Sequence, residues 1–346
     1  MAESWKFHLF VTPKYFDQCS EYGLFGVSEP NLNQLANVRP GDLAFFYTAR
    51  RRGSRTIGCI YGPFEVLSGL FYNDTVVWLP SARDQSKDKF PYRVKLRPLP
   101  QHPTENPVPV QTLWDLRDQG KIKSIVDSSA LIDKAVCTLL WDEGRMLLQA
   151  LLQANPSPAR PRDKYPGHEL AENPVDLLQF RGEGIKQFRL ECLLEAFLLT
   201  NQRHLYEMSG LADAANEAFR TQIFNQVSAY VAGGAIDIVC LYEKQVRGLW
   251  LTLTTTVFEL KKEALSSDNI EQLLENVEWA TRLLPGASRQ MVRGVLVGSD
   301  FGTESDTRAE FSRALANVAP GHPVKAFEYI VDEFRHVSFK EIPPGS

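Results

Sequence analysis

The sequence predicts an α+β protein with two domains: an N-terminal β-barrel with helices, and a C-terminal α/β domain in which helices flank a mixed sheet. At 346 residues the chain is long enough for two hydrophobic cores. Short apolar strands recur in the first hundred residues, whereas helices and strands alternate in the second half. We therefore expect a first domain at residues 1–153, a proline-rich linker at 154–176 and a second domain at 177–346.

The N-terminal strands are marked by alternation and by turn residues. WKFHLFVTPKYF begins as a strand with apolar residues on one face from Trp5 to Val11. The turn Pro40-Gly41-Asp42 then leads into the strand LAFFY. IGCIYGPFEV, VVWLP and PYRVKLRPL follow as further strands. Short strands at this spacing predict a small barrel.

Four of these segments, FGVSE, RPGDLAFFY, TIGCIYGPFEV and PYRVKLRPL, together resemble the EVE domain, a member of the PUA-like barrels, over about residues 5–100. The resemblance implies a domain that holds a flipped or single-stranded modified base in an aromatic-lined pocket. Most strand aromatics fill a core, so each candidate for this pocket competes with a packing role. The candidates for stacking are Trp5, Tyr15, Phe16, Tyr47 and Trp78, and the candidate polar readers are Ser28 and Asp42.

A run of basic residues follows the FFYT strand. Arg50, Arg51 and Arg52 are consecutive, and Arg55 lies close behind. A charge run of this kind is usually a solvated turn. Beside a base pocket it is well placed to bind DNA phosphates, which position a protein without reading sequence.

The middle of the chain changes character twice. Residues 110–153 have apolar residues at helical spacing and predict helices that pack on the barrel or, alternatively, form a dimer surface. Residues 154–174 contain five prolines and one glycine. This composition predicts a stiff tether between the two domains.

Two acids and a lysine lie within or at the end of apolar stretches in the second half of the chain. Asp237 lies within GGAIDIVCLYE, and Glu259 and Lys261 close LWLTLTTTVFELKK. Because residues i and i+2 share one face of a strand, Glu259 and Lys261 point to the side that Asp237 also faces, and Leu260 points into the core. Two carboxylates can hold one or two Mg²⁺ ions, and an ammonium can steady an attacking water or phosphate charge. A single Glu-x-Lys (ExK) tripeptide at the end of a strand more often lies at a solvated edge of a sheet and has no catalytic role.

The surrounding elements favour the catalytic interpretation. Upstream, the helix IKQFRLECLLEAFLLTNQ carries Glu191 and Glu195 one turn apart on one face. Downstream, Ser267 or Asp268 caps the helix SDNIEQLLENVEWATRLL, in which Gln272 faces the strands, and the strand RGVLVGSD follows. The order helix, strand, strand with Asp, strand with ExK, helix, strand resembles the PD-(D/E)XK nuclease core.

Two longer segments, FELKKEALSSDNIEQLLENVEWATRL and MVRGVLVGSDFGTESDTRA, are similar to the nuclease domain of the NucS/EndoMS group, and the match covers about residues 183–335. Asn276 stands where that group has a tyrosine, and the long apolar stretch before Glu259 suggests a hairpin at residues 243–248. Glu195 remains the alternative helix acid. The resemblance assigns the helix acid to Glu191, the first metal-binding Asp to Asp237, the ExK pair to Glu259 and Lys261, and the helix Gln to Gln272.

Charge and cysteine content narrow the class of protein. Residues 1–110 carry 13 Lys and Arg against 10 Asp and Glu, a net charge of +3, and the rest carries 25 against 32, a net charge of −7. An acidic catalytic domain beside a mildly basic reader argues against strong non-specific DNA binding. The five scattered cysteines form no CxxC zinc pattern and indicate reduced thiols. With neither a signal peptide nor a membrane-spanning run evident, we expect a cytoplasmic protein without membrane contact.

Together these features predict a modification-dependent restriction endonuclease that acts as a homodimer on double-stranded DNA carrying a modified base. Asp237, Glu259, the backbone carbonyl of Leu260 and Glu191 would hold Mg²⁺, for which Mn²⁺ can substitute, and Lys261 would orient or help deprotonate the attacking water. Gln272 would position the lysine or the phosphate. Two alternatives remain: a repair nuclease acting on damaged or mismatched DNA, and a non-catalytic protein that binds modified nucleic acid, including RNA.

Overall fold

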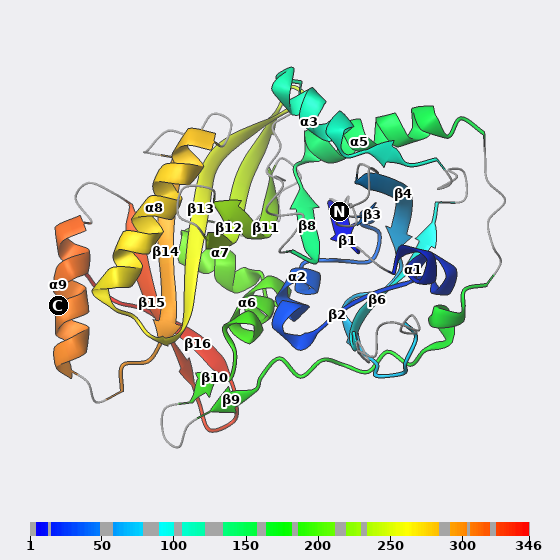
Figure 1. Ribbon diagram of the computed structural model, residues 1–346. Coiled ribbons are helices and arrows are strands. Elements are labelled where there is room, and N and C mark those ends of the chain that lie inside the picture. The colour runs from blue at the N-terminus through cyan, green and yellow to red at the C-terminus, as the bar shows by residue number, and fades with distance from the viewer. Residues whose placement is uncertain are drawn as a thin grey trace. The chain divides into compact units, whose positions relative to one another are not determined.

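The computed structural model has a mixed α+β fold (Figure 1). The chain divides into two compact units, Glu3–Val175 and Asp176–Ser346, and each is described by itself. The structure describes residues 5–12, 15–48, 58–78, 90–99, 106–121, 134–157, 164–181, 186–211, 219–229, 234–283, 291–302, 305–318 and 323–345.

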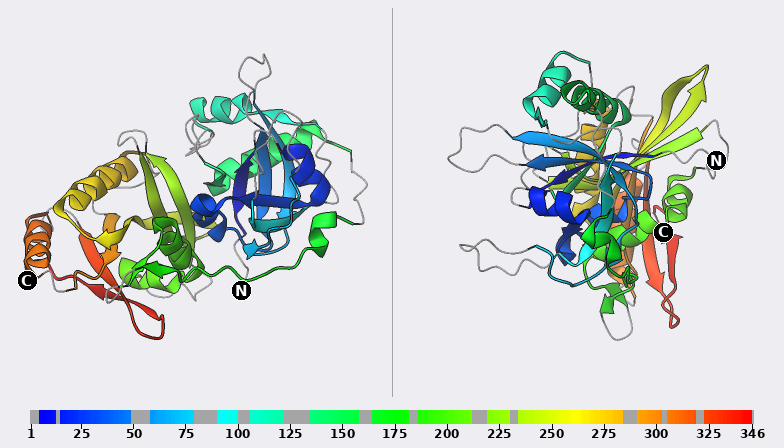
Figure 2. Two further views of the ribbon diagram at one scale, coloured as in Figure 1. Left: turned by 60° about the horizontal axis from the view of Figure 1, so that its bottom comes forward. Right: turned by 90° about the vertical axis from the view of Figure 1, so that its right-hand side faces the viewer.

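The N-terminal unit is built on a curled sheet that forms a partial barrel (Figure 2). Its strand order is β2-β6-β4-β3-β1-β8, with β5 added to β6 and β7 to β4. The β1–β3 pair is parallel, and the other pairs in this sheet are antiparallel. The strands are β1 (Phe7–Val11), β2 (Leu24–Val27), β3 (Leu43–Thr48), β4 (Cys59–Val66), β5 (Phe71–Tyr72), β6 (Tyr92–Pro98), β7 (Val108–Pro109) and β8 (Val136–Leu139).

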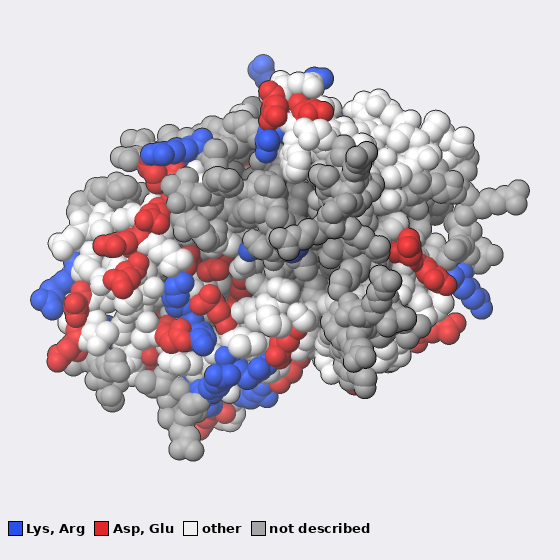
Figure 3. Space-filling view, viewed as in Figure 1, with Lys and Arg blue, Asp and Glu red and all other residues white. Residues whose placement is uncertain are grey.

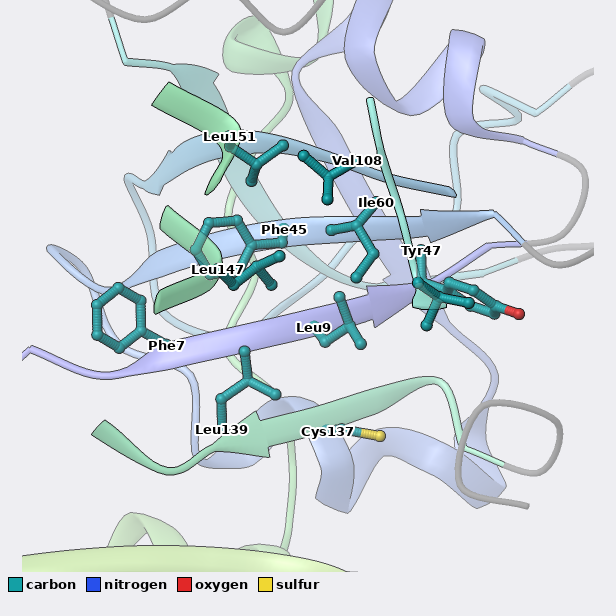
Figure 4. Packing of buried hydrophobic residues seen from close by; sticks show 11 residues of the cluster. Phe7, Leu9, Phe45, Tyr47, Ile60, Val108, Cys137, Leu139, Leu147 and Leu151 are labelled. Atoms are coloured by element: carbon teal, nitrogen blue, oxygen red, sulfur yellow. The ribbon is translucent and has the colours of Figure 1, made fainter. Parts of the chain in front are cut away.

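One helix covers an apolar face of this sheet. Leu147 and Leu151 of α5 pack against strand residues that include Phe7 and Leu9 (Figure 4). Gly144 lets the helix approach, because a Cβ at this position would lie 2.1 Å from the Phe7 ring. The helices of the unit are α1 (Phe16–Tyr22), η1 (Glu29–Asn31), α2 (Leu32–Ala36), α3 (Gln111–Asp118), α5 (Trp141–Ala154) and η2 (Pro166–Glu169).

Two parts of this unit differ from the sequence-based expectation. Within the stretch predicted to be helical, residues 136–139 form β8, which pairs with β1. Its sequence VCTL contains two β-branched residues, which favour a strand. Residues 164–175, predicted as linker, pack on the N-terminal unit instead. Lys95 Nζ donates hydrogen bonds of 2.9 Å to the carbonyls of His168 and Leu170, and Asn173 forms a β-bridge with Tyr72.

The C-terminal unit contains a six-stranded mixed sheet in the order β11-β12-β13-β14-β15-β16. The β13–β14 and β14–β15 pairs are parallel and are connected by α8 and α9, and the remaining pairs are antiparallel. The strands of this sheet are β11 (Phe219–Ala229), β12 (Gly234–Val246), β13 (Leu249–Ala264), β14 (Val292–Ser299), β15 (Val324–Val331) and β16 (Val337–Glu341). A separate antiparallel pair is formed by β9 (Phe180–Arg181) and β10 (Gln187–Phe188). The helices are α6 (Glu191–Thr200), α7 (Arg203–Ser209), α8 (Ser267–Leu283) and α9 (Ser305–Val318).

The hairpin predicted near residues 243–248 is formed by the far ends of β12 and β13. Val246 pairs with Leu249 across a two-residue turn, Arg247-Gly248, in which both residues have positive φ. Leu249, Leu251 and Leu253 alternate along β13 and are exposed. Within the described residues, no helix is both long and apolar enough to cross a lipid bilayer.

Candidate functional site

Asp237 and Glu259 lie on neighbouring antiparallel strands, β12 and β13. Ile238 pairs with Phe258, and continuing this register by one residue brings Asp237 opposite Glu259. Both side chains are buried, and Leu260 between Glu259 and Lys261 is buried in the core, as strand alternation predicts. Two acids directly opposite each other destabilise a sheet. Their placement is therefore not explained by the stability of the sheet.

Asp237 is oriented from both neighbouring strands. Its Oδ2 accepts a hydrogen bond of 2.7 Å from the backbone N–H of Leu260, and Gln226 Nε2 on β11 lies 3.3 Å from Oδ1. Burial raises the pKa of Asp237 well above its usual value, and the negative charges of Glu259, Glu195 and Glu191 raise it further, against the opposing hydrogen bond from Leu260.

Glu259 is held by one cation and one amide. Lys261 Nζ donates a hydrogen bond of 2.6 Å to Oε1, and Asn276 Nδ2 on α8 donates one of 2.9 Å to Oε2. Burial raises the pKa of Glu259, and both partners act in the opposite direction. Burial alone would lower the pKa of Lys261, but Glu259, Glu191 and Asp237 together raise it, so the ammonium stays protonated at neutral pH.

The two candidate helix acids on α6 have different partners. Burial raises the pKa of Glu191, which lies in the fields of Lys261, Glu259 and Glu263 and accepts a backbone hydrogen bond from Lys262. Glu195 is only 1% exposed, and both of its oxygens accept hydrogen bonds from β11. Both acids thus lie near Asp237 and contribute to its raised pKa.

Three amide side chains that the sequence-based site did not include contact these acids. Asn225 Nδ2 lies 3.3 Å from Glu195 Oε1, and Gln226 Nε2 lies 2.6 Å from Glu195 Oε2. Asn276 stands where the NucS/EndoMS group has a tyrosine. This difference was the one feature of the sequence that pointed to a role for Asn276 in the site. For Asn225 and Gln226 the signal was two consecutive amides inside the apolar strand IFNQV.

Gln272 is half-buried on α8, and within the described part of the chain its side chain makes no hydrogen bond. Asn276, one turn further along the same helix, makes the contact with Glu259 instead. The role assigned to Gln272 stays a prediction.

The acids suit an oxygen-liganded divalent cation in their chemistry. Carboxylates are hard oxygen ligands, and a cation would offset the charges that raise the pKa of Asp237. Among the described residues, however, no three His, Cys, Asp or Glu side chains lie close enough to hold a metal ion together. The acids are occupied by Lys261, Gln226, Asn276 and the N–H of Leu260. A cation would therefore have to displace some of these hydrogen bonds.

The N-terminal unit contains two aromatic pairs, each of which includes one of the predicted stacking residues. Phe16 stacks on Tyr61 with ring centroids 4.2 Å apart, and Tyr15 contacts Phe90 edge-on. All four rings are half-buried. The sequence did not identify Tyr61 and Phe90 as candidates for base stacking, because a half-buried aromatic residue cannot be distinguished from a core one by sequence pattern alone.

The other aromatic candidates lie in different surroundings. Trp78 is buried under the guanidinium of Arg93, at 4.8 Å from the ring centroid, and donates a hydrogen bond of 3.3 Å to Cys19 Sγ. Tyr47 is buried in the core that α5 covers. Trp5 is exposed and lies 4.6 Å from the Trp141 ring. The structure therefore favours packing roles for Trp78 and Tyr47, and their stacking roles stay predictions.

Of the two polar readers, Ser28 is half-buried and precedes η1. Asp42 is buried and holds together the start of β1 and the turn before β3. It accepts hydrogen bonds from His8 Nε2 at 2.9 Å, from the backbone N–H of Lys6 at 2.8 Å and from that of Arg39 at 2.8 Å. These contacts favour a structural role for Asp42.

The basic candidates Arg50, Arg51, Arg52 and Arg55 lie outside the described residues. On the face of the C-terminal unit visible in Figure 3, acidic and basic side chains are interspersed, and neither sign dominates. This mixed surface agrees with weak non-specific attraction to DNA.

Residues 13–128 match the EVE domain family, which confirms the EVE domain predicted from the sequence. Solved structures, among them proteins of three different organisms, are also similar to part of the chain. A protein from Leishmania major has 17% identity and a TM-score of 0.31, covering 44% of this chain and 98% of its own.

Human THYN1, in complex with 5-methylcytosine containing DNA, has 14% identity and a TM-score of 0.30, with 42% and 96% covered. The protein Atu2648 from Agrobacterium tumefaciens has 16% identity and a TM-score of 0.27, with 46% and 99% covered. No curated protein matched the chain.

Proposed function

We propose that this protein is a modification-dependent endonuclease, in which the EVE domain binds a modified base in DNA and the C-terminal unit hydrolyses phosphodiester bonds with a divalent cation. The observation that supports catalysis is the gathering of the buried acids Asp237, Glu195 and Glu259 with the half-buried Glu191 and Lys261. The EVE family match supports the proposed binding of a modified base by the N-terminal unit.

A purely structural role does not account for this cluster. Burying several carboxylates near one another costs free energy, since each disfavours ionisation of the next. The raised pKa values of Glu191, Asp237 and Glu259 express that cost. Clusters of this kind occur where a cation or a reaction uses the charge.

The roles of the residues follow from their surroundings. Asp237 and Glu259, with the backbone carbonyl of Leu260 and with Glu191, would hold Mg²⁺ or Mn²⁺ once their side chains exchange some of their present hydrogen bonds for the cation. When bound, such a cation polarises a phosphoryl oxygen and lowers the pKa of a water. Lys261 is protonated beside Glu259, so its ammonium is suited to orienting a water and stabilising phosphate charge rather than to removing a proton. Asn276 keeps Glu259 in place.

For base binding, we place the modified base beside the half-buried rings of Phe16 and Tyr61. A base taken out of the stack needs an aromatic face and a polar edge partner. The partner we propose is duplex DNA with one modified base. Cleaving both strands requires two catalytic units, and we therefore expect a homodimer.

A second candidate function is binding of modified nucleic acid, DNA or RNA, without cleavage. It is favoured by the EVE family match at residues 13–128, which supports binding of a modified base but not catalysis. A repair nuclease acting on damaged or mismatched DNA is the third possibility.

The test is a panel of matched duplexes: unmodified, mismatched, and carrying 5-methylcytosine, 5-hydroxymethylcytosine or N6-methyladenine, each with and without Mg²⁺. We expect Mg²⁺-dependent cleavage of at least one modified duplex and none of the unmodified one. Cleavage of the mismatched duplex alone would support repair. Selective binding without cleavage of any duplex would support the binding protein.

A further inference from the structure

One residue in the middle of β11 has an unusual backbone. Gln226 has a φ of 52°, which side chains other than glycine seldom adopt. The ladder to β12 continues on both sides, with Asn225 opposite Ile238 and Val227 opposite Ile236. The strand therefore passes through the distortion without losing its register.

The distortion changes where two side chains point. In a regular strand, consecutive side chains lie on opposite faces. Here the amides of both Asn225 and Gln226 reach Glu195, at 3.3 Å and 2.6 Å. Gln226 Nε2 also lies 3.3 Å from Asp237 Oδ1, so one amide joins the acid of α6 to the acid of β12.

A left-handed residue inside a strand is unfavourable unless its surroundings impose it. Glycine would adopt this conformation freely, yet the chain has a glutamine whose amide contacts two acids. Backbone strain at a cluster of buried acids is typical of functional sites. The two contacts at this position are made by the side-chain amide of Gln226, which a glycine would lack.

We propose that Gln226 is a positioning residue of the acid site, which fixes Glu195 and Asp237 relative to each other for cation binding. This inference rests on the proposed nuclease function, and it adds Glu195 to the residues of the acid site that contribute to cation binding. In this account Gln226 does not touch the reacting atoms; it determines where the two carboxylates lie.

The test compares Gln226→Met with Gln222→Met in the full chain. Gln222 lies on the same strand, and its Nε2 donates a hydrogen bond of 2.7 Å to Glu243 Oε2, another buried carboxylate outside the site. Gln226→Met removes the amide that contacts Glu195 and Asp237, and Gln222→Met removes the amide that contacts Glu243; both variants keep the side chain's length. The two readouts are cleavage of a modified duplex and the rise of Tm with Mg²⁺ in the absence of DNA.

We expect both variants to lose a similar amount of thermal stability without cation. Only Gln226→Met should cleave about 10- to 100-fold more slowly and need about tenfold more Mg²⁺ for the same rise of Tm, as is usual when a residue behind a metal ligand is removed. Equal cleavage rates and equal Mg²⁺ responses in the two variants would overturn the inference while leaving the nuclease proposal standing.

If Gln226→Met fails to fold, Gln226→Gly removes the amide and accepts the positive φ, and the same losses are expected. Wild-type activity in Gln226→Gly would show that only the bend matters and would overturn the inference. A wild-type protein with neither cleavage nor a Mg²⁺-dependent rise of Tm would overturn the nuclease proposal, and this inference with it.

Discussion

The backbone N–H of Leu260 donates a hydrogen bond of 2.7 Å to Asp237 Oδ2, so the middle residue of the Glu259–Lys261 tripeptide fixes the acid of the neighbouring strand. Gln226 approaches the other oxygen from β11. Asp237 is thereby oriented from both sides of β12, although its pKa is raised by burial and by three nearby acids. A well-oriented but electrostatically unfavourable acid is the central feature of this site.

The first prediction is that Asp237→Asn raises the stability of the cation-free protein. A buried acid whose folded pKa is raised favours folding below its unfolded pKa, about 3.9, and loses that contribution as pH rises through the folded pKa. At pH 7 the raised pKa of Asp237 therefore works against folding. We expect Asn to increase the free energy of unfolding by on the order of 1 kcal/mol and to lower cleavage about 100-fold or more.

Thermal unfolding at pH 5 and pH 7 without divalent cation measures the first effect. The gain in stability of Asp237→Asn over wild type should be larger at pH 7 than at pH 5. A lower Tm for the variant at pH 7 would contradict the electrostatic account.

The second prediction separates the two acids of α6. The family resemblance assigns the metal shell to Glu191, whereas the hydrogen bonds of Glu195 connect it to Asp237 through Gln226. If both acids contribute to cation binding, Glu191→Gln and Glu195→Gln should each slow cleavage at least tenfold without unfolding the protein. Wild-type rates in Glu191→Gln, with activity lost in Glu195→Gln, would show that the resemblance was applied one helical turn too early.

The third prediction concerns Asp42 in the EVE domain. Burial would raise its pKa, but His8 and Lys6 lower it overall. Its stabilising contribution is therefore present above the unfolded pKa, about 3.9, and is lost as pH falls through the lower folded pKa. Asp42→Asn should cost about 1–3 kcal/mol at pH 7, because it removes a charged partner from a buried network.

Calorimetric unfolding of the full chain tests this prediction. The difference between wild type and Asp42→Asn should be large at pH 7 and should shrink below about pH 4, where the carboxyl of the unfolded chain begins to protonate. An unchanged Tm at pH 7, together with a lost preference for modified DNA, would restore Asp42 as a reader of the base.

The fourth prediction concerns base stacking. Tyr61→Ala should reduce the preference for a modified duplex by up to about 1–3 kcal/mol, the usual contribution of one stacked base. Tyr72→Ala is the matched control, because Tyr72 is an exposed tyrosine of the same unit. Trp78→Ala should chiefly destabilise the domain, since Trp78 packs under Arg93 in the core. Equal binding by the Tyr61 and Tyr72 variants would contradict the proposed position of the pocket.

Much of this architecture was predictable from the sequence, and the reasons are physical. The alternation of a strand brings Glu259 and Lys261 to one side and turns Leu260 into the core, and the structure has both features. The contacts of Gln226 could not be predicted, because they depend on a single positive φ that breaks that alternation. Asn276 was visible only as a departure from a family pattern.

In the N-terminal unit, the features that could not be predicted from the sequence are the burial of individual rings and the structure of two segments. Trp78 and Phe16 are both strongly apolar, and nothing in the pattern tells the buried ring from the half-buried one. Residues 136–139 lie in a stretch with helical spacing but form a strand, because pairing with β1 outweighs local periodicity. The proline-rich segment predicted a tether, yet residues 164–175 find hydrogen-bond partners on the EVE unit.

The most direct test of the central claim is Mg²⁺-dependent cleavage of one modified duplex by wild-type protein and by Lys261→Ala, with binding measured in parallel. Lys261 forms an ion pair with Glu259 at 2.6 Å and supplies a positively charged side chain to the proposed site. We predict that the wild type cleaves, and that Lys261→Ala binds the duplex normally but cleaves about 100-fold or more slowly. Cleavage by Lys261→Ala at the wild-type rate, or no cleavage by wild-type protein that binds the duplex, would contradict the account.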